Sequence, residues 1–290
     1  MILLALLSCA IDIPDDDDPG YPPFNGGDTL DVVTWNLQLF PKNGSASIDY
    51  LEAAVRRMKP DVIAFQEVSS VSALSQLAGR LPDYSYAIGT GGDDWRLAYL
   101  YHHGTVTPDT AVYEIYPSSS RPFPRPPLVL ELTWNGERTV IIDNHLKASG
   151  NGVIDLNDAW DEETRRVEAV RLLDAYIRAH FNDVNVIVVG DLNDEITDAP
   201  QNNVFQLFID DTASYRFTDM AIALGSNLNW SYPSWPSHID HILISNELFD
   251  NHFQTKTVLY DTYLPGRWTE YVENISDHRP VSVSLVIEGD

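Results

Sequence analysis

Apolar and polar residues alternate along this chain in runs that predict short β-strands interleaved with helices. A helical period of apolar positions covers residues 47–59, where Pro60 ends it, and a second covers residues 162–181. Asn135-Gly136, between two alternating runs, predicts a hairpin. Strands are expected at residues 31–36, 61–65, 97–101, 128–133, 139–143, 184–189, 239–244 and 281–287. This order of elements predicts two packed sheets flanked by helices.

Clusters of polar residues stand at the ends of several of these strands. Glu67 directly follows an apolar run, and a carboxylate there is either solvated or needs a partner, because burying it alone is costly. Mg²⁺ is bound by one or two carboxylates together with water and substrate phosphate, so such a residue suits it. The clusters are Thr34-Trp35-Asn36, Gln66-Glu67, Asn144-His145-Leu146-Lys147, Gly190-Asp191-Leu192-Asn193-Asp194, His238-Ile239-Asp240-His241 and Ser276-Asp277-His278-Arg279-Pro280.

The Gly190-Asp191-Leu192-Asn193 segment follows a fully apolar strand. Residues i and i+2 at a strand end point the same way, so Asp191 and Asn193 can act on one phosphate and its attacking water. An Asx-type turn is the structural alternative for the same residues.

In this order, the clusters resemble the endonuclease/exonuclease/phosphatase superfamily, whose members have the deoxyribonuclease I-like fold. The resemblance covers residues 30–287 and implies an α/β (α+β) architecture. The expected fold is a four-layer α/β/β/α sandwich of two packed mixed β-sheets, formed by a single domain at residues 29–290.

The resemblance also implies the site. Its metal residues would be Asn36, Glu67 and Asp277; its catalytic residues His145, Asp191, Asn193, Asp240 and His278; its phosphate contacts Arg125, Asn193 and His145. The implied reaction is in-line displacement at phosphorus. His278, with an unperturbed pKa of about 6.5 and with Asp240 to fix its tautomer, would act with Asp191 to activate water. His145 would serve as general acid or phosphate donor.

The expected cofactor is Mg²⁺, or alternatively Mn²⁺ or Ca²⁺. His238 and His241 could suggest zinc, but no thiolates accompany them and the surrounding residues offer oxygen ligands.

One departure from the superfamily concerns His145. In deoxyribonuclease I a Glu from an earlier strand orients this His, and residues 95–99 offer no such Glu here. Asp94 or Asp143 could substitute for it.

The net charge of the chain restricts how it can bind nucleic acid. The 290 residues carry a formal net charge of -25, which disfavours a broad basic face for nucleic acid. A nuclease whose cations make local phosphate contacts stays compatible with this charge. Trp230, Tyr232 and Trp235 lead into the strand of Asp240, where they either stack on a base or pack the loop.

The N-terminus resembles a bacterial lipoprotein signal at residues 1–9, with Cys9 as the lipidated residue. No Lys or Arg precedes the apolar run, and the run is short, so an unprocessed terminus is the alternative. Residues 10–28 are acidic and rich in Pro and Gly, as expected of a linker. We therefore expect an exported protein, either membrane-anchored through Cys9 or secreted, and a monomer.

These observations favour a divalent-metal-dependent phosphodiester hydrolase, a nuclease acting on DNA or RNA outside the cytoplasm. The alternative is a small-molecule or lipid phosphoesterase of the inositol phosphatase or sphingomyelinase type. Pro233-Ser234-Trp235 loosely resembles an inositol-polyphosphate phosphatase signature, but the Cys-Asp-Arg that should follow is absent. A third class is a non-catalytic surface lipoprotein, which the complete set of polar positions disfavours.

Overall fold

The computed structural model describes Phe24 and residues 28–289. The predicted signal at residues 1–9, with Cys9, and nearly all of the predicted linker at residues 10–28 lie outside the described residues. None of the helices within the described part is long and apolar enough to cross a membrane.

Two mixed sheets form the centre of the described structure. Sheet A contains β1 (Leu30–Phe40), β2 (Val62–Val68), β3 (Tyr84–Ile88), β4 (Arg96–His102), β11 (His252–Thr257) and β12 (Val281–Leu285). Sheet B contains β5 (Tyr113–Glu114), β6 (Leu128–Trp134), β7 (Glu137–His145), β8 (Asn185–Asp191), β9 (Tyr215–Phe217) and β10 (Asp240–Ser245). The strand orders are β11-β12-β1-β2-β4-β3 and β5-β6-β7-β8-β10-β9.

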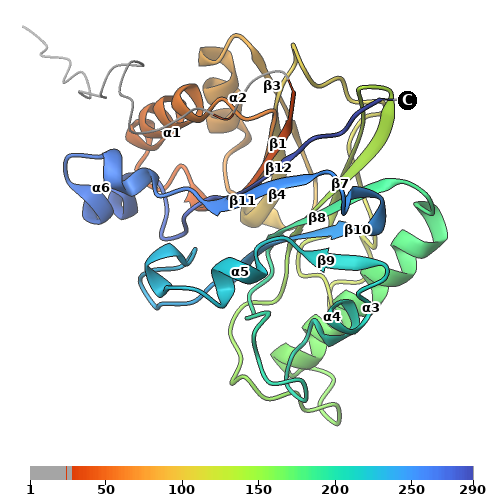
Figure 1. Cartoon of the computed structure of the whole chain (residues 1–290). Coiled ribbons are helices and arrows are strands. Elements are labelled where there is room, and N and C mark those ends of the chain that lie inside the picture. The colour runs from red at the N-terminus through yellow and green to blue at the C-terminus, as the bar shows by residue number, and fades with distance from the viewer. Residues whose placement is uncertain (1–23, 25–27, 290) are drawn as a thin grey trace, which may run out of the picture.

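Helices cover the outer faces of both sheets, as Figure 1 shows. On sheet A lie α1 (Ser45–Met58), α2 (Val71–Arg80) and α6 (Arg267–Asn274); on sheet B lie α3 (Glu162–His180), α4 (Gln206–Asp210) and α5 (Met220–Ala223). Short 3₁₀ turns are η1 (Asp93–Trp95), η2 (Asn227–Asn229), η3 (Asn246–Leu248) and η4 (Tyr260–Tyr263). One apolar cluster lies under each helical layer, and a third fills the space between the sheets. The expected four-layer sandwich is confirmed.

All eight predicted strands and both predicted helices are present, with ends shifted by a few residues. The predicted hairpin at Asn135-Gly136 joins β6 and β7, and both turn residues have positive φ as a type I′ turn requires. The first helix ends at Lys59 in a left-handed conformation just before Pro60. The pattern missed α2, α6, the short α4 and α5, and the four strands β3, β5, β9 and β11.

The topology gathers strand ends at one edge of the sandwich. In sheet A, β1 and β2 are parallel, and in sheet B, β7 and β8 are parallel. The antiparallel β10 begins with Asp240 opposite Asp191, where β8 ends. The antiparallel β12 begins with Val281 opposite Thr34 of β1. The polar clusters at these ends therefore meet across the two sheets.

Candidate active site

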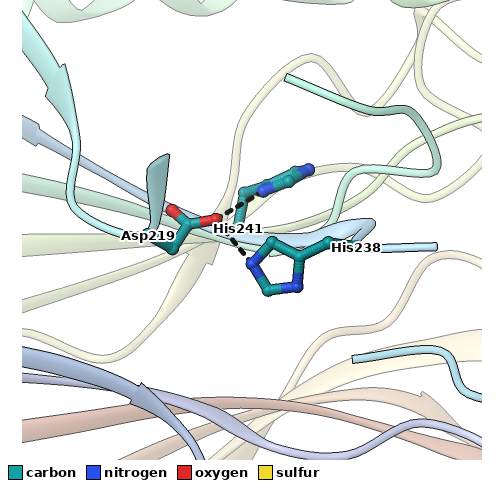
Figure 2. A group of neighbouring side chains, drawn as sticks. All are labelled: Asp219, His238 and His241. Carbon is teal, nitrogen blue, oxygen red and sulfur yellow. Dashed lines mark hydrogen bonds and ion pairs between the residues drawn. The ribbon is translucent and has the colours of Figure 1, made fainter. Parts of the chain in front are cut away.

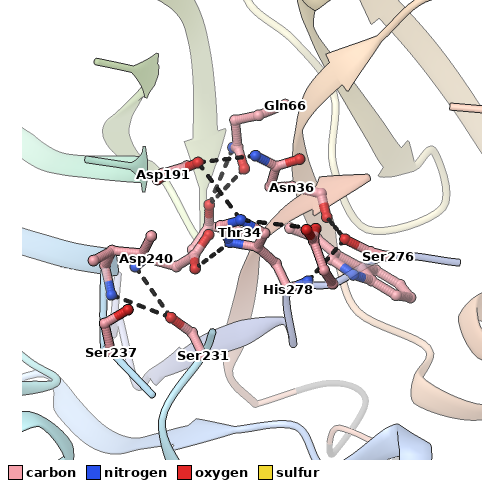
Figure 3. A network of polar contacts seen from close by, with 12 residues as sticks. Thr34, Asn36, Gln66, Asp191, Ser231, Ser237, Asp240, Ser276 and His278 are labelled. Carbon is pink, nitrogen blue, oxygen red and sulfur yellow. Dashed lines mark hydrogen bonds and ion pairs between the residues drawn. The ribbon is translucent and has the colours of Figure 1, made fainter. Parts of the chain in front are cut away.

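Residues from the ends of strands in both sheets form one polar network at this edge (Figure 3). The predicted residues Asn36, Glu67, His145, Asp191, Asn193, Asp240, Asp277 and His278 are linked there by hydrogen bonds or short charged contacts. Arg125 is close enough for its charge to act on Glu67, Asp191 and His145. Cys9 lies outside the described residues.

Glu67, one residue before the end of β2, has a strained backbone. Its φ is +61°, uncommon for a residue with a side chain, and the pairing of β2 with β4 slips between Phe65 and Val68. Asn36 Nδ2 donates to Glu67 Oε1 at 3.1 Å, and the Leu39 N–H donates to Oε2 at 3.1 Å. Burial raises the pKa of Glu67 in spite of these bonds. The strand thus holds a nearly buried carboxylate in one orientation at the sheet edge.

Asn36 joins the carboxylates of the two sheets. Its Nδ2 donates to Glu67 and, at 2.8 Å, to Asp191 Oδ2, while its Oδ1 accepts from the Gln38 N–H at 2.9 Å. The amide nitrogen therefore faces the cluster, and a nitrogen that carries two hydrogens cannot ligate a metal. In this arrangement Asn36 positions Glu67 and Asp191, and its role as a metal ligand stays a prediction that needs the amide turned over.

The Gly190-Asp191-Leu192-Asn193 segment is shaped by a close approach of β7. Gly190 has a φ of +146°, and a Cβ there would lie 1.9 Å from the Asn144 carbonyl oxygen, so no larger residue fits. Asp191 Oδ1 accepts from the Asn193 N–H at 3.1 Å, and Asn193 is left-handed. The Asx-type turn is therefore present, and it presents Asp191 Oδ2 to the site.

Asp240 and His278 meet, as expected. Asp240 Oδ2 lies 2.8 Å from His278 Nδ1, which fixes the orientation of the ring and leaves Nε2 4.0 Å from Asp191 Oδ2 and from Asp277 Oδ1. Burial alone would lower the pKa of His278, but the charges of Asp240 and Asp191 outweigh it and raise the pKa to about 10. The unperturbed pKa of about 6.5, from which a base near neutral pH was predicted, does not apply in this cluster, because buried carboxylates surround the ring and stabilise the imidazolium.

His145 faces the cluster with Nε2, which lies 3.4 Å from Asp191 Oδ2 and 3.9 Å from Glu67 Oε1. Burial, together with the charges of Arg125 and His278, lowers its pKa well below the ordinary value, so the ring is neutral. Its Nδ1 has no hydrogen-bond partner among the described residues, so neither Asp94 nor Asp143 replaces the missing Glu. Asp143 instead accepts from Gln66 Nε2 at 2.7 Å. The neutral form favours a hydrogen-bond donor over a general acid.

The site carries more negative than positive charge. Burial raises the pKa of Asp191 to about 7, with Asp240 and Glu67 adding to the effect, and Asp277 raises that of Glu67. Asp240 Oδ1 is buried without a hydrogen-bond partner among the described residues. Because clustered buried carboxylates need compensating positive charge, these oxygen donors fit a hard divalent cation. Glu67 and Asp277 would hold it, with Asp191 and Asp240 within the same cluster.

Comparisons with known proteins agree with this geometry. The sequence model described as the Endonuclease/Exonuclease/phosphatase family matches residues 33–278. The chain belongs to this family. Its members are metal-dependent phosphoesterases, and this protein is an enzyme of that class. No curated protein sequence matches the chain significantly.

Solved structures of family members share the fold. D. rerio TDP2 complexed with a single-strand DNA product has a TM-score of 0.68 at 17% identity, covering 89% of this chain and 99% of that one. The human Nocturnin catalytic domain with bound sulfate has a TM-score of 0.63 at 17% identity, covering 88% and 92%. A family protein from Bacteroides thetaiotaomicron has a TM-score of 0.63 at 18% identity, covering 92% and 100%.

Asp219, His238 and His241 form a second buried cluster, apart from the catalytic residues (Figure 2). The Ser231 N–H donates to His238 Nδ1 at 3.3 Å, so His238 Nε2 carries the proton that it donates to Asp219 Oδ2 at 3.0 Å. His241 contacts Asp219 Oδ2 at 2.6 Å and the Asp194 carbonyl oxygen at 2.9 Å. Both partners are acceptors, so both ring nitrogens of His241 carry protons.

In this arrangement no nitrogen of the two rings has a free lone pair, so the cluster is held as a buried ion pair. The identity of the metal stays a prediction.

Two further residues of the site could not be predicted from the sequence pattern. Gln38 Nε2 donates to Asp277 Oδ2 at 2.8 Å, and the charge of Lys42 interacts with Asp277 and Glu67. Gln38 lies in β1 and Lys42 follows that strand, and both Gln38 and Leu39 have positive φ. The resulting bulge turns these polar side chains toward the site, which alternation of polar and apolar residues cannot reveal.

Proposed function

We propose that this phosphoesterase is a nuclease that hydrolyses phosphodiester bonds of DNA or RNA with Mg²⁺, or with Mn²⁺ or Ca²⁺, as its cofactor. The observation that carries the proposal is the convergence of Glu67, Asp191 and Asp277 with two imidazoles and Arg125 at one edge of the sandwich. The D. rerio TDP2 structure, which holds a single-strand DNA product, supports nucleic acid as the substrate class.

The role of each residue in the reaction follows from its position in the site. Asp191 accepts the proton of the attacking water, because it is the carboxylate that faces both imidazoles. Asp240 fixes His278 so that Nε2 faces the phosphate, and neutral His145 and Asn193 donate to its non-bridging oxygens. Arg125 adds the positive charge of its guanidinium at the same phosphate group. When bound, the divalent cation supplies positive charge to the phosphoryl oxygen and the departing oxygen.

Substitution of a predicted metal ligand tests this proposal. Glu67→Gln should lose most activity toward a nucleic acid substrate while keeping its circular dichroism spectrum, and EDTA should abolish hydrolysis by the wild type until Mg²⁺ is restored. Glu288→Gln, an exposed change away from the cluster, should keep full activity.

A substrate panel decides between the substrate classes. Plasmid DNA, RNA, an inositol phosphate and sphingomyelin are compared under one set of conditions with Mg²⁺. Full activity in excess EDTA, or hydrolysis of the last two substrates alone, would reject the nuclease proposal.

We also propose that the enzyme acts outside the cytoplasm, held to a membrane through a lipid at Cys9. The Leu-Leu-Ser-Cys run and the acidic segment after it support this location. The full chain should fractionate with membranes, and Cys9→Ser should release it or leave it unprocessed. A wild-type protein found wholly in the cytosol would exclude the anchor.

A further inference from the structure

A groove with a basic floor opens beside the catalytic cluster. It has a volume of about 650 Å³ and is lined by Gly92, Asp94, Trp95, Pro124, Arg125, Lys147, Ala148 and Arg165. Three of these residues are cationic and one is acidic, in a chain with 18 Lys and Arg against 43 Asp and Glu. Such a local excess of positive charge is the reverse of the overall composition. It marks a place where anions are attracted.

The basic residues continue outward from the reaction site. Arg125 interacts with the charges of Glu67 and Asp191, so it lies at the inner end. Lys147 follows His145 by two residues, and its ammonium lies 3.6 Å from Glu162 at the start of α3. Arg165, one turn further along α3, completes the floor. The groove therefore offers more than one cation to the phosphates of a strand, with Glu162 beside Lys147 and Arg165.

A tryptophan ring lies beside the basic residue at each end of the groove. The Arg125 guanidinium lies 5.1 Å from the centre of the Trp95 ring, and the Arg165 guanidinium lies 5.8 Å from that of Trp160. Trp95 is 40% exposed and Trp160 is 67% exposed, so each offers aromatic surface to a ligand. Indole faces beside guanidinium groups are the surfaces on which single-stranded bases stack.

Hydrogen bonds and close packing hold the inner wall of the groove in place. Glu114 Oε1 accepts from the N–H groups of Thr90 and Gly91 at 2.5 and 2.6 Å. Gly92 has a φ of +89°, and a Cβ there would lie 2.9 Å from Arg125 Cγ. At the outer end, Arg165 Nε donates to the Arg121 carbonyl oxygen at 2.6 Å. Arg125 is therefore packed against Gly92 and Arg165 is held by a hydrogen bond before any ligand arrives, which lowers the entropy cost of binding.

We propose that this groove, with Trp95 and Trp160 at its ends, binds a single-stranded nucleic acid and positions it at the catalytic cluster. The inference rests on the proposed nuclease function and adds the substrate form. A duplex keeps its bases stacked inside, so it gains nothing from the two indoles, and its second strand would face the acidic surface of a chain with net charge -25. A lipid headgroup would use the cations but not the spaced indoles.

Two variants at the outer end separate stacking from charge. Dissociation constants for a fluorescent ten-nucleotide single strand are measured in EDTA, where hydrolysis stops. Trp160→Ala should weaken binding roughly tenfold to a hundredfold, as loss of one stacked base does, with an unchanged salt dependence. Arg165→Ala should weaken binding and lower the slope of log K against log salt by about 0.7.

Matched controls come from the far end of sheet B and the edge of sheet A. Arg216→Ala removes an arginine that also lies over an aromatic ring, and Phe253→Ala removes an exposed aromatic residue. Neither control should change the dissociation constant. The wild type should bind the single strand more tightly than a duplex of the same sequence and more tightly than anionic phospholipid vesicles.

A parallel assay keeps this inference separate from the nuclease proposal. Hydrolysis of bis(p-nitrophenyl) phosphate with Mg²⁺ reports phosphodiester chemistry on a substrate with no strand. If the wild type cleaves nucleic acid but Trp160→Ala and Arg165→Ala bind the strand normally, the groove assignment is rejected and the nuclease stands. Equal or tighter binding of duplex or vesicles also rejects it. If nucleic acid is bound as expected but never cleaved, the nuclease proposal fails and the groove stands.

Discussion

At the scale of single residues, the site depends on polar atoms that are held before any substrate arrives. His278 illustrates this, because three bonds fix it. Ser276 Oγ accepts from its N–H at 3.0 Å, Tyr271 donates to its carbonyl oxygen at 2.7 Å, and Asp240 engages Nδ1. Only Nε2 is left for chemistry. This arrangement predicts that Asp240 works through His278 and contributes little by itself.

Removal of either member of this pair should therefore have the same consequence. His278→Ala and Asp240→Ala should each lower kcat/KM by about 10² to 10⁴ on one phosphodiester substrate. The double variant should be little worse than the poorer single variant, because residues that act as a unit are not additive. Multiplicative losses would show that the two act independently, and no loss at His278 would remove it from the mechanism.

At the scale of elements, α3 ties two catalytic loops together through one buried side chain. Arg166 donates to Asp194 Oδ2 at 2.9 Å and to the carbonyl oxygens of Lys147 and Ser149 at 2.6 and 2.7 Å. The first contact holds the segment after Asn193, and the others hold the segment after His145. Arg166 is thus a positioning residue, since it touches neither the phosphate site nor the predicted metal ligands.

Loss of the Arg166 hydrogen bonds should make the segments after Asn193 and after His145 more mobile. Arg166→Met leaves Asp194 buried without its cation, so we expect a loss of about 3–5 kcal/mol in the free energy of unfolding. At a temperature where the variant is folded, kcat should fall more than KM rises, and Arg166→Lys should restore only part of it, because Lys lacks the planar fork. Arg171→Met, an exposed change in the same helix, is the control. Unchanged kcat in folded Arg166→Met would limit Arg166 to stability.

At the scale of the whole molecule, the buried ion pair of Asp219 and His241 links stability to pH. Burial would lower the pKa of His241, but Asp219 outweighs it and raises that pKa. Burial would raise the pKa of Asp219, but the two histidines outweigh it and lower that pKa. The His241 contribution is complete below its unfolded pKa of about 6.5 and is lost as pH rises through the folded value. The Asp219 contribution is present above about pH 3.9 and is lost as pH falls through its folded value.

The stabilisation by this pair should therefore be greatest between about pH 4 and 6.5. Asp219→Asn should cost about 3–5 kcal/mol in urea unfolding at pH 5, and the difference from the wild type should shrink at high pH. Asp183→Asn, at an exposed left-handed position that Asn tolerates, should match the wild type at every pH. An equal loss at pH 5 and at high pH would show that the pair is not ionised as its geometry implies.

The fold was predictable from sequence where burial dictates residue type. All eight predicted strands lie inside the two sheets, where a neighbour on each side and packing on both faces require apolar residues. The four missed strands, β3, β5, β9 and β11, are the four edge strands. An edge strand pairs on one side only, so it is short and partly polar, and its sequence differs little from that of a loop.

The polar clusters at the strand ends were likewise visible in the sequence, because several clusters of the same few residue types follow apolar strands. Their chemistry was not visible. The pKa of His278 follows from Asp240 and Asp191, which are distant in sequence, and the neutral state of His145 follows from burial beside Arg125. The interior strands and the residue types of the site could be predicted from the pattern of residues alone. Which charges face one another became known only from the folded chain, because electrostatic interaction depends on distance and burial and not on order along the chain.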